Sequence, residues 1–96
     1  MFELYFTSRA KYDYNLLKRN TSDKRYKAVK KTLIFLAKNP HHNSLQTHEY
    51  ISLKGPNGEK VLEAYAQQNT PAAYRVFWYY GPSQGKITIL AITPHP

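Results

Sequence analysis

The sequence predicts an α+β fold in which an antiparallel sheet carries a two-helix hairpin on one face. Three observations support this prediction: a short aromatic strand pattern opens the chain, two adjacent helix patterns follow, and strand patterns joined by short turns fill the second half. Consecutive strands with short connections must be antiparallel, whereas the first strand can pair with a later one only after the helical crossover. The expected order is therefore β-α-α-β-β-β.

The first strand and the first helix are predicted from residues 2–6 and 8–19. Residues 2–6 are aromatic and partly alternating, as is typical of a strand, and the hydroxyls of Thr7 and Ser8 can cap a helix that begins there. The apolar side chains of this helix predict one narrow buried stripe, formed by Tyr12, Leu16 and Leu17.

The second helix pattern is stronger and covers residues 23–38. Pro40 ends it, because proline cannot continue the hydrogen-bonding pattern of a helix. Apolar side chains recur at helical spacing, and the lysines lie away from them. The apolar set is Tyr26, Val29, Leu33, Leu36 and Ala37, and the lysines are Lys24, Lys27, Lys30 and Lys31.

Three further strands are predicted over residues 60–66, 74–80 and 87–92, with polar, irregular segments at 41–44 and 55–58 before the first of them. Side chains alternate between the two faces of a strand. The uncharged sets should face the helices: Leu62, Ala64 and Ala66, together with Tyr74, Val76, Trp78 and Tyr80. The opposite, uncovered face should then carry Val61, Glu63, Tyr65, Arg75, Phe77 and Tyr79.

Arg75 is the unusual residue of this arrangement, because it lies inside the aromatic run of residues 74–80. Arginine is always charged and is rarely buried without a partner, so we expect its guanidinium to be exposed on the uncovered face. There it can bind an anion such as phosphate, or it can form an ion pair with Glu63. The sequence leaves both interpretations open.

Length and composition indicate a single domain over residues 1–96, with room for one core of two packed layers. The chain has no cysteine, and we expect no metal site, because His41, His42 and His48 have no carboxylate cluster beside them. The first residues do not form a signal peptide, and no apolar stretch is long enough for a membrane span. We therefore expect a cytoplasmic protein without cofactors.

The charge is strongly basic and unevenly distributed. The formal net charge is +8, of which residues 1–48 contribute +7, with ten basic and three acidic side chains. A field of this sign attracts polyanions such as nucleic acid, or acidic segments of a partner protein. A lysine-rich helix face that only contacts water explains the same composition.

Four segments, in their order and spacing, resemble the RelE/ParE superfamily, the toxins of bacterial toxin-antitoxin modules. Residues 53–55 (Leu-Lys-Gly) resemble the entry to a strand in that family, and residues 62–65 occupy the place of its Glu-Leu-Arg-like strand. Residues 74–79 resemble its Tyr-Arg-apolar strand, and residues 89–95 its closing strand with a terminal histidine. The resemblance covers nearly the whole chain.

The resemblance implies a toxin that inhibits translation by cleaving mRNA on the ribosome without a metal. Such cleavage needs a base, an acid and cations beside the phosphate. Arg75 would stabilise the charge on the phosphate, His95 would be the acid or base, and Glu63 or Glu49 would take the complementary role. RNA binding would fall to Lys54 and Lys60 as nearby charges and to Tyr65 and Tyr79 as stacking residues. The implied partners are an acidic antitoxin, the ribosome and mRNA.

Two departures from the family pattern leave alternatives open. Ala64 and Tyr65 stand where RNA-cleaving relatives often have a further lysine or arginine, and Pro96 stands where several have a tyrosine beside the terminal histidine. The same fold also occurs in ParE-like inhibitors of DNA gyrase, which cut no RNA. The third alternative is a degenerate, non-toxic RelE-like binding module.

Overall fold

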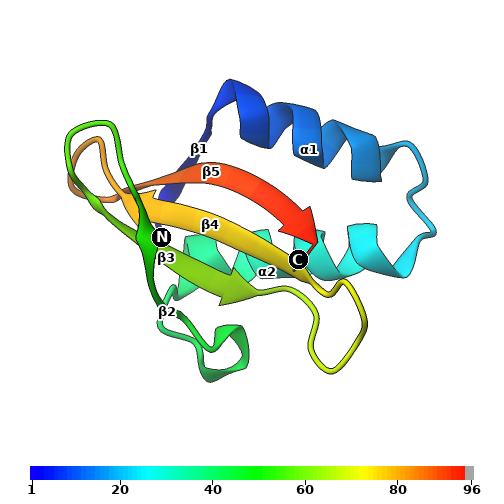
Figure 1. Cartoon of the computed structure of the whole chain (residues 1–96). Helices are drawn as coiled ribbons and strands as arrows, with labels where there is room; N and C mark the ends of the chain where they lie inside the picture. Colours follow the sequence, from blue (N-terminus) through cyan, green and yellow to red (C-terminus); the bar gives the residue numbers. More distant parts are fainter. Residues whose placement is uncertain (95–96) are drawn as a thin grey trace.

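The structure, a computed structural model, describes residues 1–94 and confirms the predicted fold class (Figure 1). One sheet and two helices make up this part of the chain. The elements are β1 (Glu3–Phe6), α1 (Ser8–Lys18), α2 (Lys24–Lys38), a single 3₁₀ turn (Asn43–Leu45), β2 (His48–Lys54), β3 (Lys60–Tyr65), β4 (Tyr74–Tyr80) and β5 (Lys86–Pro94).

The strands lie in the order β1-β5-β4-β3-β2. β1 pairs in parallel with β5, and the other neighbours are antiparallel, as the helical crossover and the short turns predict. In the described residues, neither helix is long and apolar enough to cross a membrane.

β2 corrects the predicted order, which contains no strand between the helices and residue 60. This edge strand escapes prediction because it is irregular. Four residues of β2 lie between Glu49 and Lys54, but only Val61 lies between their partners Leu62 and Lys60 on β3. The extra residues form a bulge, which breaks the alternation that identifies a strand.

The core lies between the sheet and α2, and it confirms the predicted faces of the central strands. Ala64, Val76 and Trp78 are fully buried and belong to the same apolar cluster as Val29 and Leu36 of α2. Burial of a valine or leucine side chain contributes about 1.5–3 kcal/mol to folding, so this layer fixes the position of the sheet.

The buried stripe of α1 differs from the prediction. Of the predicted stripe, Leu17 is confirmed as buried, but Tyr12 and Leu16 are exposed, and the helix buries Ala10 and Asp13 in their place. The reason is that β5 is longer than β1, so the end of β5 has no neighbouring strand on that side. α1 covers this unpaired part of the β5 edge. The Asp13 carboxylate accepts the Ile92 backbone N–H at 2.9 Å, satisfying a donor that no strand can reach.

Replacing Asp13 with alanine is expected to lower the free energy of unfolding by about 1–3 kcal/mol, because the buried Ile92 N–H loses its acceptor. An Asp13→Asn variant would keep an acceptor oxygen and lose less. Arg9 pairs with Asp13 at 3.0 Å but is exposed, so Arg9→Ala should cost less than about 1 kcal/mol. Urea unfolding measures all three, and equal losses for Asp13→Ala and Arg9→Ala would contradict this role of the carboxylate.

Candidate functional site

Glu63 is the centre of a polar cluster on the sheet face that the helices leave open. The register of β2, β3 and β4 places His48 opposite Glu63, and Arg75 opposite Tyr65. The buried Glu63 carboxylate lies 2.8 Å from His48 Nε2 through Oε1 and 3.5 Å from Arg75 Nε through Oε2. A buried carboxylate is stable only with such partners, so these three side chains form one unit.

Arg75 lies on the predicted face, but the expectation that its guanidinium is exposed is wrong. Only 8% of the residue is accessible. Its Nη1 donates to the carbonyls of Gln67 at 3.3 Å and Ala73 at 3.2 Å, and its Cζ lies 3.9 Å from the Tyr65 ring centroid. The aromatic ring and the loop carbonyls therefore cover the charge, and the ion pair with Glu63 is present in the resting protein.

His48 is the accessible member of the cluster, with 46% of its side chain exposed. Its Nδ1 lies 3.0 Å from the Gln46 carbonyl oxygen, while its Nε2 contacts Glu63. Because both ring nitrogens face oxygen atoms, only the imidazolium form can donate at both contacts. Sequence reasoning missed this residue, because its place opposite Glu63 depends on the bulge in β2.

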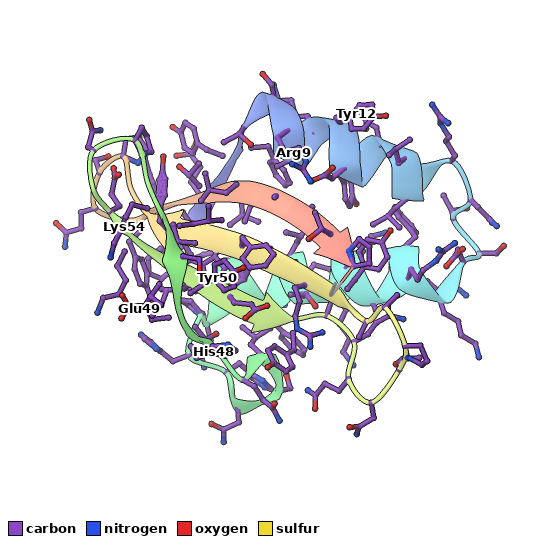
Figure 2. All side chains as sticks on the ribbon, viewed as in Figure 1. Arg9, Tyr12, His48, Glu49, Tyr50 and Lys54 are labelled. Atoms are coloured by element: carbon purple, nitrogen blue, oxygen red, sulfur yellow. The ribbon has the colours of Figure 1, made fainter. Side chains whose placement is uncertain are left out.

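The two tyrosines expected to stack on RNA have different positions. Tyr65 is half-buried, with its ring over Arg75 and 5.4 Å from the His48 ring. Tyr79 is only 7% exposed, so its predicted accessibility is wrong. Tyr50 of β2 lies over this face (Figure 2), where its ring packs on Phe77 with ring centroids 4.9 Å apart.

Lys54 and Lys60 lie away from the cluster, which corrects the expectation that they are near Arg75. They pair with each other in register and both approach Glu49, at 3.7 and 3.9 Å. Lys60 and Glu63 are three residues apart on one strand, so they point to opposite faces. Lys60 is also about 16 Å along the strand from Tyr65, the partner of Arg75.

His95 lies outside the residues that the structure describes. Within residues 1–94, no group of three or more His, Asp or Glu side chains is arranged to hold a metal ion.

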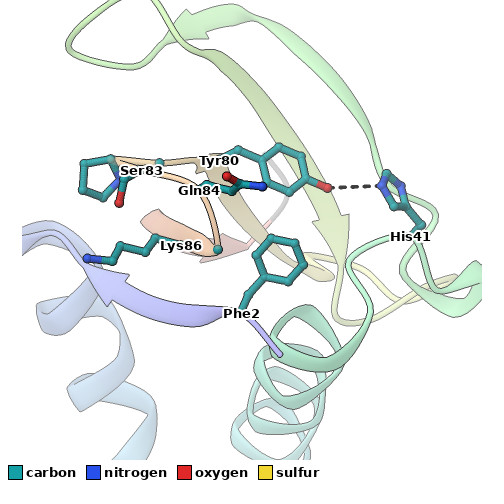
Figure 3. Close-up of a pocket in the computed structure, with 9 residues that line it drawn as sticks. Phe2, His41, Tyr80, Ser83, Gln84 and Lys86 are labelled. Carbon is teal, nitrogen blue, oxygen red and sulfur yellow. Dashed lines mark hydrogen bonds between the residues drawn. The ribbon is translucent and has the colours of Figure 1, made fainter.

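A hollow of about 580 Å³ lies elsewhere, where β4 ends and β1 begins (Figure 3). Phe2, His41, Tyr80 and the turn at 81–85 line it together with Lys86, and the Tyr80 hydroxyl lies 3.3 Å from His41 Nε2. Burial raises the pKa of this tyrosine. The lining contains no carboxylate, so it lacks the acid–base pair that the Glu63 cluster provides.

Comparison with known proteins gives matches in structure but none in sequence. No protein-family model and no curated protein sequence matches the chain. The YoeB/ParE toxin from Agrobacterium tumefaciens superposes with a TM-score of 0.71 at 13% identity, covering 99% of this chain and 100% of that one.

Two toxin-antitoxin complexes match over similar lengths. The YoeB-YefM complex from Staphylococcus aureus has a TM-score of 0.68 at 15% identity and covers 100% of this chain and 99% of the other. The archaeal RelE-RelB complex from Pyrococcus horikoshii OT3 has a TM-score of 0.64 at 15% identity, with 97% and 93% covered. The chain therefore has the fold of the RelE/ParE superfamily of toxins, as its sequence motifs predict.

Proposed function

We propose that this protein is the toxin of a toxin-antitoxin pair and inhibits translation as a ribosome-dependent, metal-free mRNA endoribonuclease. The observation that carries the proposal is the accessible imidazole of His48, held 2.8 Å from the buried carboxylate of Glu63 on the open face of the sheet. A positioned imidazole next to a carboxylate is suited to proton transfer near neutral pH. The fold, shared with YoeB and RelE toxins, supports the same function.

The proposed reaction is attack of a ribose 2′-hydroxyl on the adjacent phosphorus. The hydroxyl gives its proton to a base, its oxygen bonds to phosphorus, and the bond from phosphorus to the 5′-oxygen breaks. The 5′-oxygen takes a proton from an acid, which leaves a 2′,3′-cyclic phosphate and a 5′-hydroxyl. The reaction needs no water and no oxidant, so two proton-transfer groups and local positive charge are sufficient.

His48 takes one of the proton-transfer roles in this proposal. Glu63 on Nε2 fixes the ring, and Nδ1 exchanges its surface contact with the Gln46 carbonyl for an oxygen of the RNA. This is the general arrangement in which a carboxylate orients an imidazole and the second nitrogen meets the substrate. The complementary proton-transfer role is proposed for His95.

Arg75 and Tyr65 have supporting roles in this proposal. Arg75 positions the Glu63 carboxylate and compensates its negative charge. The carboxylate therefore repels an RNA phosphate over the cluster less than an unpaired carboxylate would. Tyr65 is half-buried, and the accessible part of its ring can contact a base. A direct contact of Arg75 with phosphate requires its guanidinium to leave the Glu63 carboxylate and the Tyr65 ring.

We further propose an acidic antitoxin as the partner that inhibits the protein, in addition to the ribosome and mRNA as targets in the cytoplasm. The related folds from Staphylococcus aureus and Pyrococcus horikoshii occur in complexes with YefM and RelB. For this chain, the net charge of +8 raises the rate of encounter with an acidic partner, whichever surface that partner then covers.

Induced expression tests the function in cells. Growth should stop through loss of translation, and mapping of mRNA 5′ ends should reveal new ends within translated regions. Supercoiling of a reporter plasmid, measured in the same cells, tests for inhibition of DNA gyrase and should not change. Intact mRNA together with inhibited supercoiling would contradict the proposal and favour a ParE-like gyrase inhibitor, and normal growth with folded protein would favour a non-toxic binding module.

A further inference from the structure

The net charge of the protein lies entirely in its helical layer. Residues 8–38, which contain both helices and the turn between them, carry ten basic and two acidic side chains and therefore a net charge of +8. The rest of the chain carries four basic and four acidic side chains and is neutral. The field that attracts polyanions thus originates from the helices and not from the strands.

Both acidic side chains of the helical layer are neutralised within it. Asp13 pairs with Arg9 at 3.0 Å, and Asp23 pairs with Arg25 at 2.7 Å. Hydrogen bonds from Arg25 lower the pKa of Asp23 to about 2, so this pair stays charged on both sides at neutral pH. In residues 1–94, none of the remaining cations of the layer forms an ion pair: Lys11, Lys18, Arg19, Lys24, Lys27, Lys30, Lys31 and Lys38.

Four of these lysines form a straight ridge along α2. With 3.6 residues per turn, Lys24, Lys27, Lys31 and Lys38 fall within an arc of about 60° on the helix surface. This arc is opposite the buried stripe centred on Val29, and all four side chains are exposed. The ridge is about 21 Å long, because each residue adds about 1.5 Å along the helix.

The sheet has no comparable surface. Glu49 lies between Lys54 and Lys60, and Glu63 pairs with Arg75. Lys86 lies 5.2 Å from the Tyr5 ring centroid, and its pKa is raised by hydrogen bonding to the Tyr5 side chain. The candidate site and the uncompensated charge are therefore on different sides of the molecule.

We propose that the lysine ridge of α2, with the neighbouring cations of the helical layer, binds the phosphate backbone of folded RNA. A row of lysines presents point charges at intervals, which suits the repeated charges of a nucleic-acid backbone and reads no base sequence. A protein partner normally requires a buried apolar centre in its interface. On this side of α2 the large exposed apolar side chain is Ile34, which is surrounded by lysines. The inference does not depend on cleavage, because it concerns binding by a separate surface.

The test compares the wild type with the variant K24Q/K27Q/K31Q/K38Q. Glutamine is a good helix former, so circular dichroism and the unfolding midpoint should change little. The probe is a short fluorescent RNA duplex, titrated at several salt concentrations. The slope of log Kd against log salt should fall by about three to four, just under one for each of the four lost phosphate contacts, and affinity at low salt should fall by roughly 100-fold.

The control variant D23N/R25Q removes one ion pair from the same helix and leaves the net charge at +8. Asparagine also caps helices well, so the fold should be kept, and the salt slope should equal that of the wild type. An unchanged slope in the four-lysine variant would overturn the proposal. Binding of polyglutamate as tightly as the RNA duplex at the same salt would also overturn it, and would indicate an acidic protein as the partner of this surface.

Discussion

Replacing Arg75 with alanine is expected to lower the free energy of unfolding by about 3 kcal/mol or more. The substitution removes the buried cation beside the Glu63 carboxylate, and an uncompensated buried charge is strongly destabilising. The loss also removes the packing between the guanidinium and the Tyr65 ring. Urea unfolding of the purified variant measures this effect directly.

A double-mutant cycle separates the ion pair from other effects of truncation. Glu63→Ala with Arg75→Ala should cost less than the sum of the two single changes, because neither charge is then left alone. If the two losses of unfolding free energy were additive, or if Arg75→Ala were as stable as the wild type, Arg75 would not be the residue that positions the Glu63 carboxylate. The stability of Arg75→Ala also matters for toxicity assays. Loss of toxicity in this variant indicates a role of Arg75 in RNA cleavage only if the variant is folded under the conditions of the assay.

His48→Ala is expected to reduce mRNA cleavage by about 10²–10⁴-fold, which is the usual contribution of a general acid or base. The fold should survive, because the side chain is 46% exposed and Glu63 keeps Arg75 as a partner. The expected loss of stability is below about 1 kcal/mol. Single-turnover cleavage on purified ribosomes, together with urea unfolding, measures both quantities.

His41→Ala provides the matched control, because His41 is also exposed but pairs with the Tyr80 hydroxyl and not with a carboxylate. It should cleave at the wild-type rate. Added imidazole should partly restore cleavage by His48→Ala if the missing group transfers a proton. Cleavage by folded His48→Ala at the wild-type rate, with the same dependence on pH, would remove His48 from the mechanism while leaving the nuclease proposal intact.

Local patterns predicted those parts of the fold that depend on neighbouring residues alone. The alternation in residues 74–80 correctly places Val76 and Trp78 in the core and Arg75 on the other face, because side-chain direction in a regular strand follows from position. Helical spacing likewise identified most of the buried face of α2. The fold class was predicted from the order of the helix and strand patterns, and the resemblance to the RelE/ParE superfamily from the order and spacing of four short segments.

The remaining features depend on contacts between distant segments. The place of His48 opposite Glu63 requires the bulge in β2, and counting residues back from the turn at 55–58 gives a different partner. The burial of Asp13 depends on the length of β5 beyond β1, which α1 covers. The burial of Arg75 depends on loop carbonyls and on Tyr65, so its sequence context alone indicated an exposed charge.

The chemical ends of the RNA fragments test the central claim most directly. The protein is incubated with a defined mRNA on purified ribosomes, and the new ends are identified. Attack by the 2′-hydroxyl, for which the His48–Glu63 pair is proposed to transfer a proton, predicts fragments that end in a 2′,3′-cyclic phosphate and begin with a 5′-hydroxyl. Intact mRNA, or fragments with 3′-hydroxyl and 5′-phosphate ends, would contradict it.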